Sequence, residues 1–426
     1  MFNIPLEKWN MVKVMKNKRM GVMRMNKTSF RKPKLLITAS TFPRWENDTE
    51  PRFILDLAKA LLKYFDVTVL APAAPNAKEK EKIEGVKVIR YHYFPIHSLE
   101  SLCYPGAIVP RIKERKSRIL LVPFLFGALF LKLLKIQKKY DIIHANWLIP
   151  QGIIQSFFKT PFVITGHGGD VSSLNNILIK RLKIKALHRA SGITVVSKEL
   201  KSQLNTYYPE EHVQVVSMGC DTGKFGPQHR IDNFYGTSEK KTILFVGRLA
   251  EKKGVRYLIE AVKDIDARVI IVGAGPLEKQ LKKQAISQGS KIHFLGAKNH
   301  DELVSIYASA DIFVAPSIVA KDGDKEGLPT TIIEAMASGL PVIGSDSGGI
   351  REIIINNENG FLVHEKRTTE IAEKLQILLN DNELYLYMKE NALKTAEKYS
   401  YSHIGAKYAD ILLNAIYKKD NCNTEG

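Results

Sequence analysis

The chain has 426 residues, of which 45% are hydrophobic, which is enough for two cores of ordinary domain size. A formal net charge of +19 at pH 7 favours acidic partners such as nucleotides, anionic lipid headgroups or nucleic acid. Three widely spaced cysteines, Cys103, Cys220 and Cys422, show neither metal-ligand spacing nor a disulfide framework, which argues against an oxidising compartment.

The first 33 residues are predicted to be a flexible basic extension. They are rich in Lys, Arg and Met and lack the apolar core of a secretory signal. From residue 34 onward, apolar runs typical of strands alternate with amphipathic runs typical of helices. This alternation predicts parallel sheets with helices on both faces.

Two series of strands follow one another along the chain. Strand candidates of the first series are PKLLITAS, VTVLAP, KVIRY, DIIHAN, FVITG and GITVVS, with FILDLAKALLKY as a helix. A polar stretch, DTGKFGPQHRIDNFYGTSEKK, then predicts a linker. The second series is TILFVGR, ARVIIVGAG, IHFLGA, DIFVAPS and LPVIGS. We therefore predict two doubly wound α/β domains, over residues 34–225 and 226–398, and a C-terminal helix over 399–420 that could return to the first domain.

The longest apolar run, ILLVPFLFGALFL, covers residues 119–131. At about thirteen residues, with Pro123 and Gly127 inside it, the run is shorter than the roughly twenty residues that cross a bilayer. Lysines and arginines flank it on both sides. Two interpretations stay open: a buried helix of the first domain, or an apolar patch with a cationic rim that docks on a membrane surface.

Two carboxylates, Glu326 and Glu334, are separated by seven residues in the segment EGLPTTIIEAMASGLPVIGS. Pro329 is expected at the first position of a helix over TTIIEAMAS, since its missing N–H is not needed there. The N–H groups near residues 328–331 and the positive helix end predict an anion site suited to phosphate. A carboxylate beside that site suits the hydroxyls of a sugar or a ribose. The alternative is that Glu334 lies on a solvated helix face.

Further polar and glycine-rich clusters follow predicted strands of the second series. GRLAEKKG places Arg248 and Lys253 on one turn beside Gly247, and a guanidinium with an ammonium suits a diphosphate. A solvated basic turn is the alternative. The glycines of GAGPL, including Gly275, also fit ordinary strand–helix packing. The backbone near Leu295 in HFLGA is expected to frame a base or a ribose.

In the first series, ITGHGGD places His167 at a strand end among glycines that allow a close approach. HANWLIPQG brings His144, Trp147 and Gln151 to another strand end, where an indole suits either a sugar face or the core. The loop AKDGDKEG carries Asp322, Asp324 and Glu326 at alternate positions, as an acidic metal site would. Because no histidine accompanies these acids and Glu326 has another use, we expect no metal there.

Taken together and in this order, FVGRLAEKKG, GAGPL, FLGA, EGLPTTIIE, EAMASGLPVI and SMGCDTGKF resemble the retaining glycosyltransferases of family 4. The resemblance covers roughly residues 35–415 and implies the GT-B fold, in which two Rossmann-like domains face each other across a cleft. It implies that His167, Glu326, Arg248 and Lys253 are catalytic. The implied donor-binding residues are Gly247, Arg248, Lys253, Gly275, Leu277, Leu295, Glu326, Gly327, Leu328, Pro329, Thr330 and Glu334.

One departure concerns the acceptor. Many relatives carry a glycine pair in the loop after the first strand, whereas the loop here is TFPRWENDTEPRF. We expect Arg44, Trp45 and Arg52 to act in its place, with His144, Trp147 and Gln151 as further acceptor residues.

The resemblance implies transfer of a hexose from a nucleotide diphosphate sugar to an acceptor hydroxyl, with retention of configuration and no metal or other cofactor. Relatives that build exopolysaccharides or lipid-linked glycans suggest a glycan or lipid-linked acceptor. The +19 charge and the apolar run with its basic flanks predict a cytoplasmic enzyme that is peripheral on an anionic membrane. The basic residues are not interleaved with aromatics as in a nucleic-acid-binding module, so no nucleic-acid partner is expected. A nucleotide-sugar epimerase, which needs no acceptor, and a basic nucleic-acid-binding protein are the alternatives. A phosphorylase would need a pyridoxal lysine, for which no motif is found.

Overall fold

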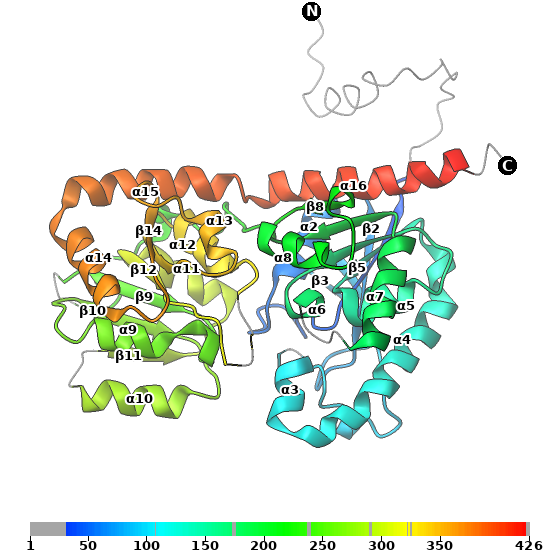
Figure 1. The fold of residues 1–426 in the computed structure, drawn as a ribbon, viewed down its shortest axis with the longest axis horizontal. Coiled ribbons are helices and arrows are strands. Elements are labelled where there is room, and N and C mark those ends of the chain that lie inside the picture. The colour runs from blue at the N-terminus through cyan, green and yellow to red at the C-terminus, as the bar shows by residue number, and fades with distance from the viewer. Residues whose placement is uncertain are drawn as a thin grey trace, which may run out of the picture. The chain divides into compact units, whose positions relative to one another are not determined.

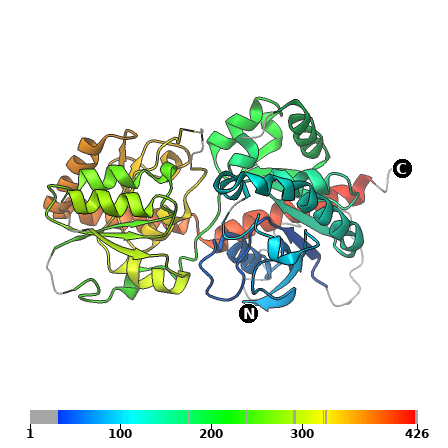
Figure 2. The ribbon, with the colours of Figure 1, turned by 90° about the horizontal axis from the view of Figure 1, so that it is seen from below.

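The computed structural model describes residues 31–422 except 107, 173–175, 237–239, 289–291, 322, 324 and 325. Most of the predicted basic extension, and the predicted acidic pair Asp322 and Asp324, therefore lie outside the described residues. From Pro33 onward the chain forms one unit that contains two sheets, with helices on both faces of each (Figures 1 and 2).

The first sheet has eight strands in the order β3-β4-β2-β1-β5-β6-β7-β8. Neighbours are parallel except β3 and β4, which form an antiparallel pair at the edge. The strands are β1 (Lys34–Thr38), β2 (Asp66–Pro72), β3 (Lys80–Ile83), β4 (Val86–Tyr91), β5 (Ile142–Asn146), β6 (Phe162–Gly166), β7 (Gly192–Val195) and β8 (Val213–Val215). The central strands are buried along almost their whole length because helices cover both of their faces.

The helices of this part of the chain surround the first sheet. They are α2 (Phe53–Leu61), α3 (Ile108–Glu114), α4 (Val122–Ile136), α5 (Ile153–Gln155), α6 (Gly169–Ser172), α7 (Ile177–Arg189) and α8 (Lys198–Asn205). A π-helical turn over Leu148–Gly152 connects β5 to α5.

The second sheet is entirely parallel, in the order β11-β10-β9-β12-β13-β14. Counted from β9, this is the strand order 3-2-1-4-5-6 of a dinucleotide-binding Rossmann sheet. Its strands are β9 (Thr242–Val246), β10 (Arg268–Val272), β11 (Ile292–Gly296), β12 (Ile312–Ala315), β13 (Val342–Ser345) and β14 (Gly360–Val363). The helices that follow are α9 (Val255–Ala261), α10 (Glu278–Ser287), α11 (His300–Ala308), α12 (Thr330–Ala337), α13 (Ile350–Ile353), α14 (Thr368–Asn380), α15 (Asn382–Glu397) and α16 (Tyr401–Cys422).

The chain passes between the two domains twice, and the two passages are hydrogen bonded to each other. The Cys220 N–H donates to the carbonyl of Tyr399 at 2.9 Å, and the Tyr401 N–H donates to the carbonyl of Cys220 at 3.1 Å. Gly219 allows this approach, since a Cβ there would lie 2.8 Å from the Tyr401 ring. Helix α16 then packs on α2 (Figure 1). Its Tyr408 is fully buried in the core of the first domain.

The apolar run is longer and more exposed than the sequence indicates. Helical structure continues over Lys116–Lys139, where the mean hydropathy reaches 2.2 and 17% of the most apolar window is buried. Among the described residues this is the one helical stretch long and apolar enough to cross a membrane. Pro123 does not interrupt it, because the proline falls at the start of α4, where no N–H is needed. One side of α4 is buried through Leu125, Leu129 and Leu133, while several large apolar side chains point outward: Ile119, Leu120, Phe124, Leu131 and Leu134.

Candidate active site

The strand order of each domain creates a crevice at one place in its sheet. In the first sheet the order reverses between β1 and β5, and in the second between β9 and β12. Loops that leave neighbouring strands at such a point diverge, which opens a space at the carboxyl ends of the strands. The segments after β1, β5, β9 and β12 carry most of the residues that the sequence predicts to be functional.

Glu326 lies in the long loop between β12 and α12, where two lysines surround its carboxylate. The Lys253 Nζ is 3.0 Å from Glu326 Oε2, and the Lys252 Nζ is 3.8 Å from Oε1. Burial raises the pKa of the Glu326 carboxyl, but the two ammonium groups outweigh it and leave the pKa below its ordinary value. Glu326 is therefore a buried, ionised acceptor of hydrogen bonds.

The turn after β9 places its two cations in different settings. Lys253 faces Glu326, whereas the Arg248 guanidinium lies 3.4 Å from the carboxylate of Glu114 at the end of α3. Gly254, at φ +61°, makes this turn possible, since a Cβ there would lie 1.8 Å from the Pro316 carbonyl oxygen. A Cβ on Gly247 would lie 3.1 Å from the Phe245 ring. Both glycines therefore allow the close packing of the turn that orients the Arg248 and Lys253 side chains.

Helix α12 begins one residue later than the sequence predicts. Pro329 is the residue before the helix, with extended backbone, and Thr330 is the first helical residue. The loop that carries Glu326 and Leu328 leads directly into the first turn of this helix, where the Ile332 N–H donates to the Pro329 carbonyl at 3.2 Å. The first N–H groups of a helix have no acceptor within the helix itself. The helix start therefore adds a partial positive charge beside the lysines.

Glu334 lies one turn further along α12 and is partly buried. The hydroxyl of Tyr307, on α11, donates to Glu334 Oε2 at 3.0 Å. Burial raises the pKa of the Glu334 carboxyl to about 7, although the Tyr307 hydrogen bond opposes the change. This helix face is therefore neither apolar nor freely solvated, and its carboxylate can accept hydrogen bonds from a ligand.

Glu334→Gln is expected to stabilise the free protein at pH 8 by roughly 1–2 kcal/mol and to leave stability unchanged near pH 4. A carboxyl whose pKa is about 7 when folded and 4.5 when unfolded favours folding most below 4.5, and that contribution is lost as the pH rises through 7. Urea unfolding at both pH values measures the difference. An equal effect at the two pH values would show that the carboxylate is not destabilised by burial.

Three further predicted donor residues, Gly275, Leu277 and Leu295, lie at the carboxyl ends of strands β10 and β11. Gly275 follows β10, and a Cβ there would lie 2.4 Å from the Leu249 carbonyl oxygen. That carbonyl also accepts the Leu277 N–H at 3.0 Å, so the turns after β9 and β10 are joined. Leu295, near the end of β11, is partly buried against the core.

His167 follows β6 in the first domain and meets the second domain at Gly327. A Cβ on Gly327 would lie 2.6 Å from the His167 carbonyl oxygen. The imidazole Nε2 is 3.0 Å from the Asn146 amide oxygen. The ring packs in a cluster with those of Phe53 and Trp147, whose centroids lie 5.4 and 4.9 Å away and 6.0 Å from each other. Burial lowers the pKa of His167 to about 3, so the imidazole is neutral.

The predicted acceptor residues divide into exposed and buried groups. Trp45 is 39% exposed, with the Arg44 guanidinium 4.3 Å from its ring centroid, and Arg44 is held by Asp48 through two hydrogen bonds. Trp147 is partly buried, and its φ of +75° is unusual for a residue with a side chain.

Burial corrects the assignment of His144 and Gln151 to the acceptor. His144 is fully buried, bonds to Thr165 and packs against the Tyr408 ring of α16. Gln151 is 1% exposed and exchanges hydrogen bonds with Ser40. Both side chains belong to the core beneath the strand ends.

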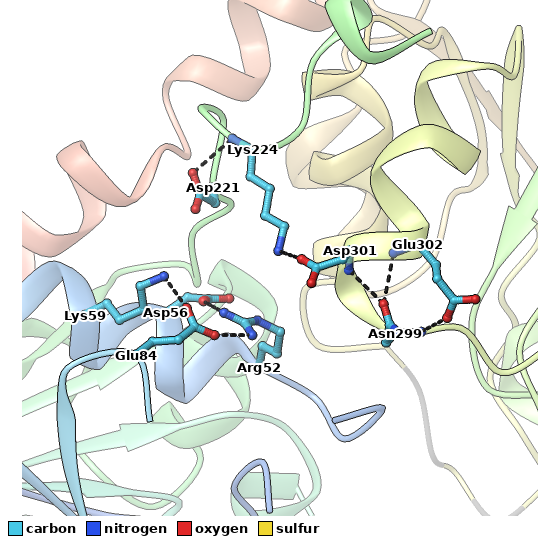
Figure 3. Close-up of polar contacts among 9 residues, drawn as sticks. All are labelled: Arg52, Asp56, Lys59, Glu84, Asp221, Lys224, Asn299, Asp301 and Glu302. Atoms are coloured by element: carbon cyan, nitrogen blue, oxygen red, sulfur yellow. Dashed lines mark hydrogen bonds and ion pairs between the residues drawn. The ribbon is translucent and has the colours of Figure 1, made fainter. Parts of the chain in front are cut away.

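The Arg52 side chain also forms its ion pairs within the protein. Its guanidinium donates to Glu84 at 2.6 Å and to Asp56 at 3.0 Å, and Figure 3 shows it enclosed by these two carboxylates. Across from them, Lys224 of the linker reaches Asp301 at the start of α11. Arg52 therefore supports α2 and is not directed at an acceptor.

Three polar residues at the site are not singled out by the sequence. Asn146 bonds to His167, and Glu114 faces Arg248. Asp170 accepts hydrogen bonds from three backbone N–H groups around His167. Asn146 and Asp170 belong to the strand-end segments HANW and HGGD, so their position was a usable signal. Among the described residues no group of three or more His, Cys, Asp or Glu is placed to hold a metal.

Comparison with known proteins gives consistent matches along the chain. The family model "Glycosyltransferase Family 4" matches residues 51–224, and "Glycosyl transferases group 1" matches residues 228–395. An uncharacterized glycosyltransferase of Methanocaldococcus jannaschii is 30% identical over 299 residues, which is 64% of this chain and 75% of the relative.

Two relatives with named activities cover less of the chain. A GDP-mannose-dependent α-(1-6)-phosphatidylinositol monomannoside mannosyltransferase of Mycobacterium tuberculosis is 30% identical over 52% of this chain and 61% of its own. An amylovoran biosynthesis glycosyltransferase of Erwinia amylovora is 39% identical over 38% of this chain and 41% of its own. None of these three relatives is named as an epimerase or a nucleic-acid-binding protein.

Solved structures share the fold. Sucrose-phosphate synthase from Thermosynechococcus elongatus superimposes with a TM-score of 0.72 at 19% identity, over 92% of this chain and 100% of that one. HepE of Anabaena, solved with UDP and glucose, gives 0.69 at 21% identity, over 89% and 99%. The architecture is thus that of a GT-B glycosyltransferase, as the sequence predicts. The chain belongs to the group 1 glycosyltransferase family, with a family 4 N-terminal half.

Proposed function

We propose that the protein is a retaining hexosyltransferase that uses a nucleotide diphosphate sugar, needs no divalent metal and acts on a glycan or lipid-linked acceptor. One observation carries the proposal. Glu326, held ionised by two lysines, meets the neutral His167 of the other domain across Gly327. A buried carboxylate and a neutral imidazole are suited to binding sugar hydroxyls. Ammonium groups beside them are suited to a phosphate.

The donor would lie with its diphosphate over Lys253 and the start of α12. Negative charge develops on the leaving diphosphate in the transition state, and preorganised cations and N–H groups stabilise it. Arg248 would join them once it turns from Glu114 toward the phosphate. Glu334 would accept hydrogen bonds from the ribose hydroxyls, and the backbone near Leu295 would border the base.

The donor sugar would lie between Glu326 and His167. The cavity lined by Gly168, Glu326 and Gly327 holds about 10 Å³, room for no more than one water. In the proposed mechanism the domains separate to admit the donor and close again before transfer, and closure excludes water. The UDP and glucose bound by HepE support a nucleotide sugar donor.

For retention, we propose that the leaving phosphate takes the acceptor proton on the same face of the sugar. Glu326 is paired with two lysines. It would therefore accept hydrogen bonds from the sugar hydroxyls and would not act as the nucleophile of a double displacement. Trp45 and Trp147 would border the acceptor on the first domain.

A thermal-shift panel of UDP- and GDP-sugars tests the donor assignment, because a ligand that binds only the folded state raises its stability by mass action. At least one nucleotide sugar is expected to raise Tm by several degrees. Transfer that depends on added acceptor then separates a transferase from an epimerase. No shift with any nucleotide sugar would refute the proposal.

Transfer is expected to continue in excess EDTA at no less than about half its rate, because side-chain cations and N–H groups take the place of a metal. Initial rates with and without chelator, and after addition of Mg²⁺, measure this. Loss in EDTA with recovery in Mg²⁺ would contradict it and direct attention to Glu326 and the loop that precedes it.

We further propose that the protein docks on the cytoplasmic face of an anionic membrane through the helical stretch over Lys116–Lys139, which includes α4. Leu120 is 71% exposed and Phe124 is 47% exposed, while Leu129 keeps the helix attached to the domain. Basic residues border this apolar strip, and the segment over Lys116–Lys139 contains no acidic residue. Such a surface suits an anionic leaflet. The phosphatidylinositol mannoside mannosyltransferase among the relatives supports an acceptor presented at a membrane.

Removal of this surface is expected to abolish vesicle binding. Each basic residue near an anionic leaflet contributes about 1 kcal/mol, so four neutralisations lower partitioning by roughly a thousandfold. Arg118 is left intact because it bonds to Ser101 and Glu114. The residues changed to Gln are Arg115, Lys116, Lys135 and Lys138.

Cosedimentation with vesicles of anionic or neutral lipid, at low and high salt, measures the partitioning. Leu120→Ser with Phe124→Ser tests the apolar contribution. Leu386→Ser with Tyr387→Ser, on similarly exposed residues of α15, is the matched control. Equal binding to neutral and anionic vesicles, or none to either, would contradict the proposal.

A further inference from the structure

Asp170 joins the two loops that carry the aromatic and imidazole side chains of the site. It lies in the short helix α6, directly after His167 and two glycines. Its Oδ1 accepts the N–H groups of His167 at 3.1 Å and Gly168 at 2.9 Å. Its Oδ2 accepts the N–H of Leu148 at 2.7 Å, in the loop that follows β5. One carboxylate therefore fixes backbone groups after two neighbouring strands.

Both tethered loops contribute to the surroundings of the imidazole. Leu148 follows Trp147, whose φ is +75° and whose indole packs against the His167 ring. A non-glycine residue keeps such a conformation only where neighbouring groups stabilise it. The hydrogen bond from the Leu148 N–H to Asp170 stabilises the backbone directly after Trp147. Asn146 completes the set by bonding to the imidazole itself.

The segment around Asp170 is anchored again from its other side. The Val171 carbonyl accepts hydrogen bonds from the buried Lys183 Nζ at 3.1 Å and from the Tyr207 hydroxyl at 3.2 Å. Gly166 lets the segment lie against the end of β6, since a Cβ there would lie 2.5 Å from the Val171 side chain. Burial raises the pKa of the Asp170 carboxyl, and its three N–H donors oppose this rise.

We propose that Asp170 is a positioning residue for the transfer reaction, acting through His167 without touching the sugar. The inference rests on the proposed role of His167 at the donor sugar. The Asp170 carboxylate fixes the position of the His167 backbone. It therefore fixes the position of the imidazole and of the His167 carbonyl, which Gly327 approaches. A neutral amide offers one oxygen where three N–H groups need acceptors, so Asp170→Asn releases one of the two loops.

Kinetics of Asp170→Asn test the proposal. The expected result is a fall in kcat of about tenfold or more, a donor KM within about threefold of wild type and unchanged UDP affinity. The ¹⁵N shifts of the His167 imidazole are expected to change as well. Tyr207→Phe, which removes a hydrogen bond to Val171 on the same segment, is the control. It is expected to lower Tm while kcat stays within about twofold.

A double-mutant cycle with His167→Ala separates positioning from general support of the fold. If Asp170 acts through His167, Asp170→Asn adds less than about a twofold loss in the His167→Ala background. Additive losses of kcat in the double mutant, or equal losses of kcat in Tyr207→Phe and Asp170→Asn, would overturn the inference about Asp170 but not the proposed role of His167. Wild-type transfer by His167→Ala would overturn it together with the proposed role of His167. If Asp170→Asn is not recovered folded, Asp170→Glu is measured against the same criteria.

Discussion

Lys253→Ala is expected to lower kcat/KM for the nucleotide sugar by about 100- to 1,000-fold, the loss typical of removing one preorganised donor from a developing oxyanion. Lys253 has two roles in the site: it would face the leaving diphosphate, and it lies 3.0 Å from Glu326. Without it, the carboxylate keeps Lys252 at 3.8 Å as a weaker partner. The variant is therefore expected to fold, with a modest loss of stability.

Two control variants separate these roles. Lys252→Ala removes the more exposed and more distant lysine and is expected to cost less than about tenfold in kcat/KM. Glu326→Gln in the Lys253→Ala background removes the uncompensated carboxylate, which should recover stability but not transfer. Wild-type kinetics of Lys253→Ala at subsaturating donor would show that the diphosphate lies elsewhere.

Gly327→Ala is expected to lower kcat by about tenfold or more while UDP affinity stays within about threefold. The new Cβ would lie 2.6 Å from the His167 carbonyl oxygen, closer than real contacts of this kind. The oxygen belongs to a loop fixed by Asp170, so it cannot move away at low cost. The domains would be held slightly apart, and a site assembled by closure would stay incomplete.

Calorimetric titration with UDP and steady-state transfer kinetics measure the two effects. Gly127→Ala is the control, because a Cβ on Gly127 of α4 meets nothing within 4 Å. It should leave kcat unchanged with a soluble acceptor and stabilise the helix by up to about 1 kcal/mol. A matched loss of UDP affinity in Gly327→Ala would show that the substitution damages the second domain itself.

Much of the second domain could be predicted from the sequence because its signals are local. A glycine or a charged residue follows most of its apolar runs, and Pro329 marks the start of α12 within one residue. The prediction omits three strands, β3 and β8 in the first sheet and β14 in the second, where GFLV is a short edge strand paired only with β13. β3 is KEKI, a charged edge strand with a partner on one side only, and β8 has three residues.

The acceptor side was harder to predict because contacts distant in sequence decide it. His144 and Trp147 lie three residues apart, yet one packs beneath α16 and the other beside His167. Nothing in HANWLIPQG shows that Tyr408, from the far end of the chain, covers His144. Arg52 is occupied by Glu84 for the same reason.

The two hydrogen-bonded passages near Cys220 also set limits on how this enzyme can be divided or recombined. Because the last 22-residue helix supplies Tyr408 and Leu412 to the core of the first domain, that domain is assembled from both ends of the chain. A fragment that stops at the linker would expose this core, and a chimera that exchanges the second domain between relatives must leave α16 with the first domain. The second domain, in contrast, is a continuous insertion that can be exchanged as one piece.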